Sequence, residues 1–353
     1  MTQRITSSDI ARAAGVSQTT VSFVLNNTEG TSISAKTRVR VLNAAQALGY
    51  VPNSAARTLV SGRSRTLGLV LAHGDLMSFD AFAPPLMFGI GRVCNARGYK
   101  LLIDAVEPGP RRNAYFDLTR SKSIDALIVL NSNSEDEGLV RLIESKFPVI
   151  LFGSIGHPDE NSISPNTWKA AEYATRHLIE LGHCRIAHIT YAPVRYIGAN
   201  ERLKAYRRAL EGAGVSFDET LVASGDFSME SGYHAMREIL GRTHRPTALF
   251  AGNDTIAVGA ISALREAGLS VPADVAVVGF DDLPIAAYTF PKLTTVTTQA
   301  GAQGEQAALA AIELLEGQRV GKRDCHLSLE LIVRESCGAK MVNPSVNERQ
   351  PVG

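Results

Sequence analysis

The amino-acid sequence predicts an α/β protein with a small all-α head at its amino end. Two observations carry this prediction. Residues 1–66 place apolar side chains at helical spacing, whereas from Leu67 onward short apolar runs alternate with amphipathic segments. The second pattern is typical of parallel strands whose sheet is covered by helices on both faces. Each half of the remaining chain contains four such runs, which fits two doubly wound lobes in a chain of 353 residues.

The candidate strands are short and apolar, and a helical pattern precedes or follows each of them. In the first half they are residues 67–71, 101–104, 126–130 and 149–152. In the second half they are residues 186–189, 221–223, 248–251 and 275–278, with later strands at 294–296 and 329–333. Helices are expected over 168–181 and 303–315. The strands at 294–296 and 329–333, with the helix at 303–315 between them, are expected to return the chain to both lobes.

The head is predicted to contain three helices. The first spans residues 7–14 behind a capping box, and the second spans 18–26 behind Ser17, with a tight glycine turn between them. A third helix follows Ser34 as its cap. Its expected buried stripe consists of Val41, Leu42, Ala45 and Leu48.

Charge is distributed unevenly along the chain. The whole sequence has 36 Lys/Arg and 35 Asp/Glu, yet residues 1–66 hold eight Lys/Arg against only Asp9 and Glu29. The head therefore has a net charge of +6 and the remainder has −5. Lys and Arg that neutralise phosphates supply most of a protein's nonspecific affinity for DNA. A basic head on a mildly acidic body thus indicates a module that meets nucleic acid.

Two short helices joined by a tight turn, with a polar outward face on the second, indicate a helix-turn-helix motif. The second helix of such a motif is sized for the major groove of DNA. The candidate DNA-contacting residues of this region are Ser17, Gln18, Thr19, Thr20, Ser22, Phe23 and Asn26.

Three runs of the head carry a more specific signal. They are IARAAGVSQTTVSFVLN at 10–26, GYVPN at 49–53 and AARTL at 55–59. Together they resemble the head and hinge of the lactose-repressor (LacI/GalR) family. The resemblance continues through nearly the whole chain, because further runs are similar to the effector-binding core of that family. Among them are RLKAY at 202–206, GND at 252–254 and VGFDD at 278–282.

The resemblance implies two periplasmic-binding-protein-like lobes joined by three crossovers, a homodimer, a pseudo-palindromic double-stranded operator and a small-molecule effector. Some members of the family are induced by their effector and others are corepressed. The expected parts are residues 1–62 for the head and hinge helix, 63–163 plus 299–324 for the N-terminal effector lobe, 164–298 plus 325–340 for the C-terminal effector lobe, and 341–353 for a flexible tail. The tail has no heptad repeat, so a dimer is expected rather than a tetramer.

The resemblance also implies that residues 53–60 form a hinge helix that inserts Leu59 into the minor groove and kinks the duplex. Ala56 is small enough to let two such helices approach closely. Members of the family often place an arginine where Phe23 stands. Because Phe23 cannot make the bidentate contact of arginine with guanine, it either touches a thymine methyl group or packs on the head.

In open α/β sheets, ligands bind beyond the carboxyl ends of the strands. Arg202, Phe227, Asn253 and Asp281 all follow predicted strands at those ends. Their chemistry suits a sugar, since the polar groups can bind hydroxyls in pairs while Phe227 packs on the C–H face of the ring. A purine that stacks on the same ring is the alternative, although Arg195 departs from the pattern of purine-responsive relatives. From the first lobe the candidate contacts are Asp80, Phe82 and Asn131.

Other classes of function are disfavoured. The chain shows no signal peptide and no apolar run of membrane-spanning length, and its four cysteines are far apart, which favours the cytoplasm. It has no phosphate-binding loop or nucleophile elbow, and Gly89-Ile90-Gly91 lacks the third glycine of a dinucleotide fingerprint. No catalytic residue, cofactor or metal site is therefore expected. A sugar-binding transport protein is the strongest rival, and the basic head argues against it.

Overall fold

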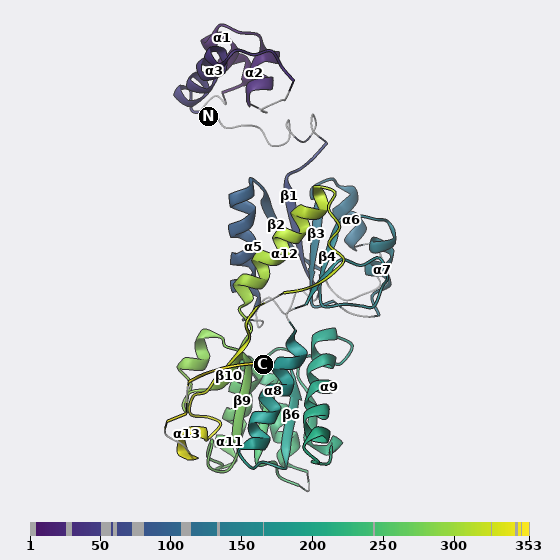
Figure 1. Ribbon diagram of the computed structural model, residues 1–353, viewed down its shortest axis with the longest axis vertical. Coiled ribbons are helices and arrows are strands. Elements are labelled where there is room, and N and C mark those ends of the chain that lie inside the picture. The colour runs from purple at the N-terminus through teal and green to yellow at the C-terminus, as the bar shows by residue number, and fades with distance from the viewer. Residues whose placement is uncertain are drawn as a thin grey trace. The chain divides into compact units, whose positions relative to one another are not determined.

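The structure is a computed structural model that describes residues 5–25, 30–50, 58, 62–72, 81–106, 114–132, 135–164, 166–242, 244–325, 327–342, 345–346 and 348–352. It contains two compact units, Met1–Ser64 and Arg65–Gly353, shown in Figure 1. The first unit is the head and the second is the body, and each is described separately.

The head consists of three helices, as predicted. They are α1 (Ser7–Ala14), α2 (Gln18–Leu25) and α3 (Ala35–Ala47). The capping box of α1 is present, because the Thr6 backbone N donates to the Asp9 carboxylate at 2.9 Å while the Thr6 hydroxyl accepts from the Asp9 backbone N at 3.4 Å. The core of the head is formed by Ile10, Ala14, Val21, Val24, Val41 and Ala45.

The predicted buried stripe of α3 is half wrong. Val41 and Ala45 are buried, but Leu42 is 46% exposed and Leu48 is 36% exposed. Each residue turns the helix by about 100°, so Leu42 lies well around the helix from Val41. Val41 and Ala45 are four residues apart and already fill the contact with the other two helices.

The first lobe of the body is built on a six-stranded parallel sheet. Its strands are β1 (Thr66–Ala72), β2 (Lys100–Val106), β3 (Ala126–Leu130), β4 (Val149–Phe152), β5 (Ser162–Ser164) and β11 (Lys322–Asp324). Its helices are α5 (Ala83–Arg97), α6 (Ala114–Arg120), α7 (Glu137–Glu144) and α12 (Ala300–Leu315). Helices α5 and α12 lie on one face of the sheet, and α6 and α7 lie on the other (Figure 1). Their apolar side chains form a core with the strands on each face.

The second lobe is built on a seven-stranded sheet. Its strands are β6 (Ile186–Thr190), β7 (Val222–Ser224), β8 (Ala248–Ala251), β9 (Ala276–Asp281), β10 (Thr294–Thr297), β12 (Glu330–Ile332) and β13 (Arg349–Pro351). Its helices are α8 (Thr167–Glu180), α9 (Ile197–Gly212), α10 (Met229–Leu240), α11 (Asp254–Glu266) and α13 (Ala339–Val342), with short 3-10 turns at Glu219–Leu221 and Pro284–Ala287. Helices α8 and α9 cover one face, and α10 and α11 cover the other.

The two sheets share one strand order. In the first sheet it is β2-β1-β3-β4-β5 and in the second it is β7-β6-β8-β9-β10, so the order reverses beside β1 and beside β6. Ligand crevices form at the carboxyl ends of strands on either side of such a reversal. The chain passes between the sheets after β5, after β10 and after β11. The α/β fold with two doubly wound lobes and an all-α head is therefore confirmed.

Three short strands were not predicted, namely β11 and β13 at the sheet edges and β5 between β4 and β11. Each has three residues and carries mostly polar side chains, so none stands out as an apolar run. Strand β13 also corrects the expectation of a flexible tail over residues 341–353. It pairs antiparallel with β12, the Val352 backbone N donates to the Leu329 carbonyl at 2.9 Å, and Val346 and Val352 pack on the core of the second lobe.

The glycines of the Gly89-Ile90-Gly91 run lie in the middle of α5 and serve helix packing. A Cβ atom on Gly89 would lie 2.0 Å from the Gly301 carbonyl oxygen of α12. No side chain fits in that space, so glycine lets the two helices approach closely. Helix α12 begins directly after the second crossover, and its contact with α5 fixes it to the first lobe.

Candidate functional site

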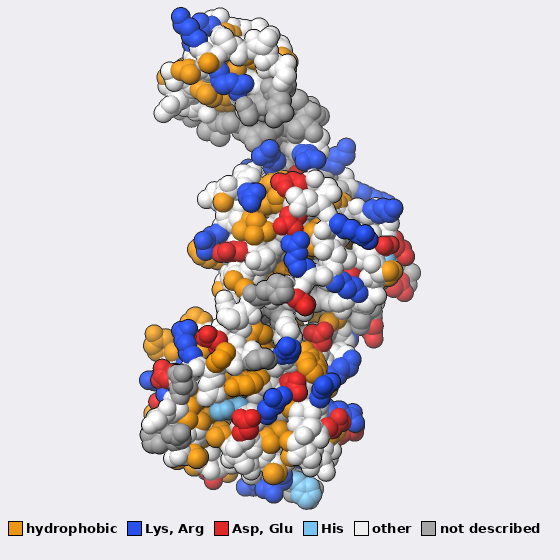
Figure 2. Space-filling view, in the orientation of Figure 1, with side chains coloured by type: hydrophobic (Ala, Val, Ile, Leu, Met, Phe, Trp, Pro, Cys, Tyr) orange, Lys and Arg blue, Asp and Glu red, His pale blue; other side chains and the backbone are white. Residues whose placement is uncertain are grey.

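The first candidate site is the outward face of α2 in the head. Ser17 caps this helix, because its hydroxyl accepts from the Thr20 backbone N at 3.1 Å. The Gln18 amide donates to the Ser7 hydroxyl at 2.8 Å and thereby ties α2 to α1. Val21 and Val24 face the core, so the opposite side of the helix faces solvent. Figure 2 shows Lys and Arg side chains on the surface of the head as well.

Most of the predicted DNA-contacting residues lie on this outward face. Ser17, Gln18, Thr19 and Phe23 are exposed, and Thr20 and Ser22 are half-buried. Phe23 is 38% exposed, so its ring is not enclosed by the core of the head and can reach a bound partner. Three further predicted contacts, Asn26, Ala56 and Leu59, lie outside the described residues.

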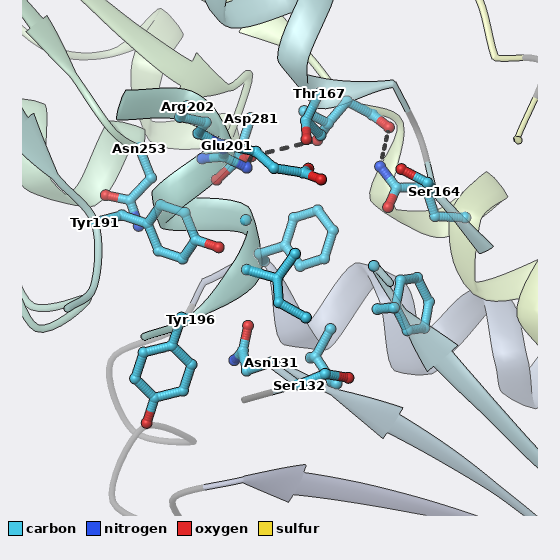
Figure 3. Close-up of a pocket in the computed structure, with 18 of the residues that line it drawn as sticks. Asn131, Ser132, Ser164, Thr167, Tyr191, Tyr196, Glu201, Arg202, Asn253 and Asp281 are labelled. Carbon is cyan, nitrogen blue, oxygen red and sulfur yellow. Dashed lines mark hydrogen bonds and ion pairs between the residues drawn. The ribbon is translucent and has the colours of Figure 1, made fainter. Parts of the chain in front are cut away.

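The second candidate site is a cleft between the two lobes of the body. It contains about 760 Å³ of space not filled by protein atoms, including its opening to solvent, which is in the range of small-molecule sites. It lies at the carboxyl ends of β3, β4, β6, β8 and β9, where both strand orders reverse. Figure 3 shows the polar side chains of both lobes facing this cavity.

Arg202 of α9 is held in place by four neighbours. Its Nη2 lies 3.6 Å from Asp281 Oδ1, and its Nη1 donates to the Gly252 carbonyl. Its guanidinium carbon lies 4.4 Å from the ring centre of Tyr191, which lines the cleft, and 3.9 Å from that of the buried Phe280. The side chain is 9% exposed, and its Nε has no hydrogen-bond partner among the described residues. Arg202 is thus a buried, oriented donor at the edge of the cleft.

Asn253 and Asp281 lie beside Arg202 at the ends of β8 and β9. Asn253 caps α11, because its Oδ1 accepts from the Ile256 backbone N at 2.8 Å, and the same side chain lines the cleft. Asp281 accepts from the Thr298 hydroxyl at 3.5 Å and has a φ of 106°. Positive φ values are strained for residues other than glycine and cluster at functional sites.

Asp254, next to Asn253, supports this end of the cleft from inside the protein. Its carboxylate accepts from the Thr295 hydroxyl at 2.6 Å and from the Leu283 backbone N at 2.7 Å. Complete burial raises the pKa of Asp254 well above its usual value, and the nearby Asp281 carboxylate raises it further, while the bond from Thr295 acts against them. The loop that follows Asp281 at the end of β9 is therefore hydrogen-bonded to the first residue of α11.

Phe227 lies in a cluster of three aromatic rings. Tyr191 meets its ring edge-on at 5.2 Å and Tyr196 does so at 5.8 Å. Phe227 has a φ of 73° and is 3% exposed, so its ring is largely covered by the other two. Tyr191 is half-buried and points its hydroxyl into the cavity in Figure 3. The aromatic wall of the cleft is therefore wider than the single ring predicted from the sequence.

The first lobe contributes Phe82, Asn131, Ser132 and Phe152 to the cleft. Asn131 has a φ of 59°, and Ser132 follows it at the end of β3. The Ser132 hydroxyl is buried and has no hydrogen-bond partner among the described residues. An unpartnered buried hydroxyl beside a cavity is a group that a bound ligand can satisfy. Asp80, the third candidate contact of the first lobe, lies outside the described residues.

Sequence reasoning missed several residues that line the cleft, namely Ser132, Thr167, Tyr191, Tyr196 and Glu201. All of them follow a strand at its carboxyl end, so the rule that selected Arg202 could also have selected them. Partial burial raises the pKa of Glu201, while the charges of Arg202 and Lys204 oppose that rise.

The chain matches two family models. Residues 6–53 match the model described as bacterial regulatory proteins of the lacI family, and residues 175–337 match the model of a periplasmic binding protein-like domain. The first match covers the helix-turn-helix head and the second covers most of the second lobe. The fold and its two sites define a class of DNA-binding regulator that carries a ligand cleft.

Individual relatives give the same result over nearly the whole chain. The sequence is 35% identical to the HTH-type transcriptional regulator CelR of Thermobifida fusca over 93% of this chain and 96% of that protein. It is 34% identical to the HTH-type transcriptional repressor PurR of Klebsiella pneumoniae (strain 342), over 92% and 93% respectively. The protein belongs to the LacI family of transcriptional regulators.

Solved structures resemble the fold closely. A CelR–cellobiose complex has a TM-score of 0.72 with 32% identity, covering 94% of this chain and all of that one. The lac repressor dimer bound to operator and the anti-inducer ONPF has a TM-score of 0.82 with 28% identity, covering 95% and 99%. Within the described residues, no helix is both long and apolar enough to cross a membrane.

Proposed function

We propose that this protein is a repressor that binds operator DNA as a homodimer and that a neutral sugar in the cleft controls its operator affinity. The observation that best supports a sugar as the effector is that Arg202, Asp281 and Asn253 lie together beside an aromatic wall. Charged and amide groups of this kind bind vicinal hydroxyls through paired hydrogen bonds, and aromatic faces pack on the C–H groups of a pyranose. A glucoside or galactoside has both features.

The similarity to the CelR–cellobiose complex supports this choice of effector. That complex covers 94% of this chain at 32% identity, and we infer that corresponding segments form the cleft of each protein. A purine or nucleoside is the second candidate, because PurR is similar at 34% identity. The charged and hydroxyl groups from both lobes favour the sugar, since a flat base would leave many of them without partners.

Operator recognition is assigned to the head. Ser17 and the outward-facing residues of α2 up to Phe23, together with Asn26, contact bases in the major groove. Phe23 contacts a thymine methyl group rather than guanine. Leu59 acts as an apolar wedge in the minor groove, with Ala56 at the contact between two hinge helices. The protein performs this role in the cytoplasm and catalyses no reaction.

An exposed apolar patch on the second lobe supports the homodimer. Tyr288 is 86% exposed, Phe290 is 83% exposed, and Ile285 in the preceding 3-10 turn is 38% exposed. Exposed aromatic side chains grouped in one loop are typical of protein interfaces. We assign the lobe limits at residues 63–163 plus 299–324 and 164–298 plus 325–340, and a two-fold dimer then presents two heads to the two halves of a pseudo-palindromic operator.

The control step is a shift between arrangements of the two lobes. A sugar that contacts Arg202 in the second lobe and Ser132 in the first binds one arrangement more tightly than others and increases its population. The three crossovers carry that change to the first lobe, from which the chain continues to the hinge and head. Operator affinity then depends on sugar concentration through a coupling free energy between the two sites.

Calorimetric titration of the full-length protein tests this proposal. Cellobiose, lactose and ribose are compared with hypoxanthine and guanine under the same conditions. We expect saturable binding of at least one sugar with one site per protomer. Binding of a nucleobase and of no sugar would replace the sugar by the purine alternative.

A further inference from the structure

One charged side chain of the cleft has no hydrogen-bond or ion-pair partner among the described residues. Glu201 lines the cleft from α9, one residue before Arg202, and Figure 3 shows its carboxylate extending into the cavity. The Arg202 guanidinium turns instead to Asp281 and to the Gly252 carbonyl. In the part of the chain that the structure describes, no hydrogen bond or ion pair joins the Glu201 carboxylate to another residue.

This position is unfavourable for an isolated carboxylate. Glu201 is half-buried, and partial burial raises its pKa because the ionised form loses water, although Arg202 and Lys204 favour that form. A carboxylate has two oxygens that each accept hydrogen bonds, and leaving them without donors in a part-buried site costs free energy. A ligand that offers two neighbouring hydroxyl groups removes this cost.

The charge of the cleft restricts which ligands can donate hydrogen bonds to the Glu201 carboxylate. Among the described residues that line it, Arg202, Asp281 and Glu201 are the charged ones. Arg202 and Asp281 form a pair at 3.6 Å, so Glu201 gives the charged side chains of the described lining a net charge of −1. An anionic ligand would meet that charge in surroundings that screen it less than water does. A neutral ligand would not.

We propose that Glu201 is a specificity-determining residue, whose carboxylate accepts hydrogen bonds from two neighbouring hydroxyls of a neutral sugar and excludes sugar phosphates and sugar acids. This inference rests on the proposed function and narrows the ligand class of the same cleft. It also gives the adjacent residues of α9 different tasks, because Arg202 donates hydrogen bonds and Glu201 accepts them.

The test compares the full-length wild type with E201Q, E201A and a matched control, E211Q. Glu211 lies on the same helix but is exposed and pairs with Arg207 at 2.9 Å, away from the cleft. Each protein is titrated with cellobiose, lactose and ribose and with their anionic counterparts cellobionate, lactobionate and ribose 5-phosphate. Thermal denaturation of each variant reports whether it is folded.

We expect the wild type to bind a neutral sugar at least about a hundredfold more tightly than the anionic ligands. E201Q, which is nearly isosteric, should lose about tenfold or more of that affinity, the loss that follows from removing a charged hydrogen-bond partner. E201A should lose more, and E211Q should stay within about twofold of the wild type. Should E201Q unfold, E201D takes its place, and its shorter carboxylate should weaken sugar binding while keeping the preference for neutral ligands.

Three results would overturn the assignment. Equal sugar affinity of the wild type and the Glu201 variants would leave the proposed function intact and remove Glu201 from it. Tighter binding of an anionic sugar than of its neutral counterpart by the wild type would remove the role of Glu201 and would also overturn the choice of a neutral sugar as the effector. If no neutral sugar binds to the wild type, the proposed function itself fails, and the role of Glu201 fails with it.

Discussion

The outward face of α2 and the lining of the cleft use similar polar side chains, but they hold them very differently. Gln18 and Thr19 are exposed on a short helix, whereas Arg202 is 8% exposed and Asn253 is 3% exposed. An exposed polar group exchanges water for its partner at little net gain, so such a surface depends on many contacts and on charge. A buried group that loses its partner pays the full cost of desolvation.

The difference teaches where single substitutions act. In the head, affinity for a phosphate backbone is shared among many side chains, and removing one of them has a small effect. In the cleft, groups such as Arg202 are oriented in advance by buried contacts, so we expect the loss of one of them to have a large effect on affinity and stability. The four predictions below test this contrast, starting with the largest expected effect.

Removal of residues 1–62 should abolish specific operator binding while the body stays folded. The body forms its own compact unit with separate cores, and the candidate DNA contacts all lie in the deleted part. Electrophoretic mobility shift with operator DNA should show a loss of at least about a thousandfold, since specific binding exceeds nonspecific binding by that factor or more. Circular dichroism should show a folded body without the helical signal of α1, α2 and α3, and sugar titration should be unchanged. Specific operator binding by the shortened protein would contradict the assignment of the head.

Arg202→Ala should weaken both sugar binding and folding. It leaves the Asp281 carboxylate buried without its cation and removes the guanidinium from between Tyr191 and Phe280. Breaking a buried pair by removing one partner costs about 3 to 5 kcal/mol of stability. Sugar affinity should fall about a hundredfold by calorimetry, and the melting temperature should fall as well. Arg207→Ala on the exposed side of α9 is the control. A similar loss of sugar affinity and melting temperature in that variant would show that burial of the arginine does not determine the size of the effect.

His177 extends the contrast to a titrating group of the body. Burial, with a smaller contribution from His183, lowers the pKa of His177 to about 4. The folded state therefore favours neutral imidazole, while the unfolded chain takes up a proton near pH 6.5. Stability should be full above pH 6.5 and should decrease as the pH falls toward 4, by about 1.4 kcal/mol for each unit of pKa difference.

Denaturant unfolding at several pH values measures that slope. In His177→Gln the dependence between pH 6.5 and 4 should be flatter than in the wild type. The exposed His234→Gln is the control for replacing a histidine by glutamine elsewhere on the second lobe. An identical slope in the wild type and in His177→Gln would show that His177 is not responsible.

Ser132→Ala should have the smallest effect, and only when sugar is present. The Ser132 hydroxyl has no partner among the described residues, so its removal should change the free energy of unfolding by no more than about 1 kcal/mol. Sugar affinity should fall about fivefold, because one neutral hydrogen bond contributes about 1 kcal/mol. A large loss of stability without sugar would mean that the hydroxyl already serves the fold.

The sequence predicted the elements that carry strong patterns. Strands 126–130, 149–152 and 248–251 have the predicted limits, because each is a fully apolar run in the middle of a sheet. Polar strands such as β13 and β11 were not predictable, since backbone pairing with a neighbouring strand forms them and their side chains give no signal. Leu42 was wrongly predicted to be buried, because its exposure depends on which face of α3 packs against the other two helices of the head.

The cleft was predictable in part. Strand order and motif spacing brought Arg202, Asn253 and Asp281 to one edge, and they meet there. Their division of labour was not visible, because only the three-dimensional structure reveals that Asn253 also caps a helix or that Tyr191 covers Arg202. Glu201 was not predicted as a site residue, because the sequence does not show that Arg202 pairs with Asp281 and that Glu201 lines the cavity.

The central claim, that occupancy of the cleft controls the head, is tested most directly by operator affinity with and without the bound sugar. The apparent Kd of the wild type for a labelled operator is measured by fluorescence anisotropy. It should change at least about tenfold when the sugar saturates the protein, which corresponds to a coupling free energy of about 1.4 kcal/mol. Arg202→Ala should show no such change at the same sugar concentration. Operator affinity that is the same with and without every sugar that binds to the cleft would contradict the account.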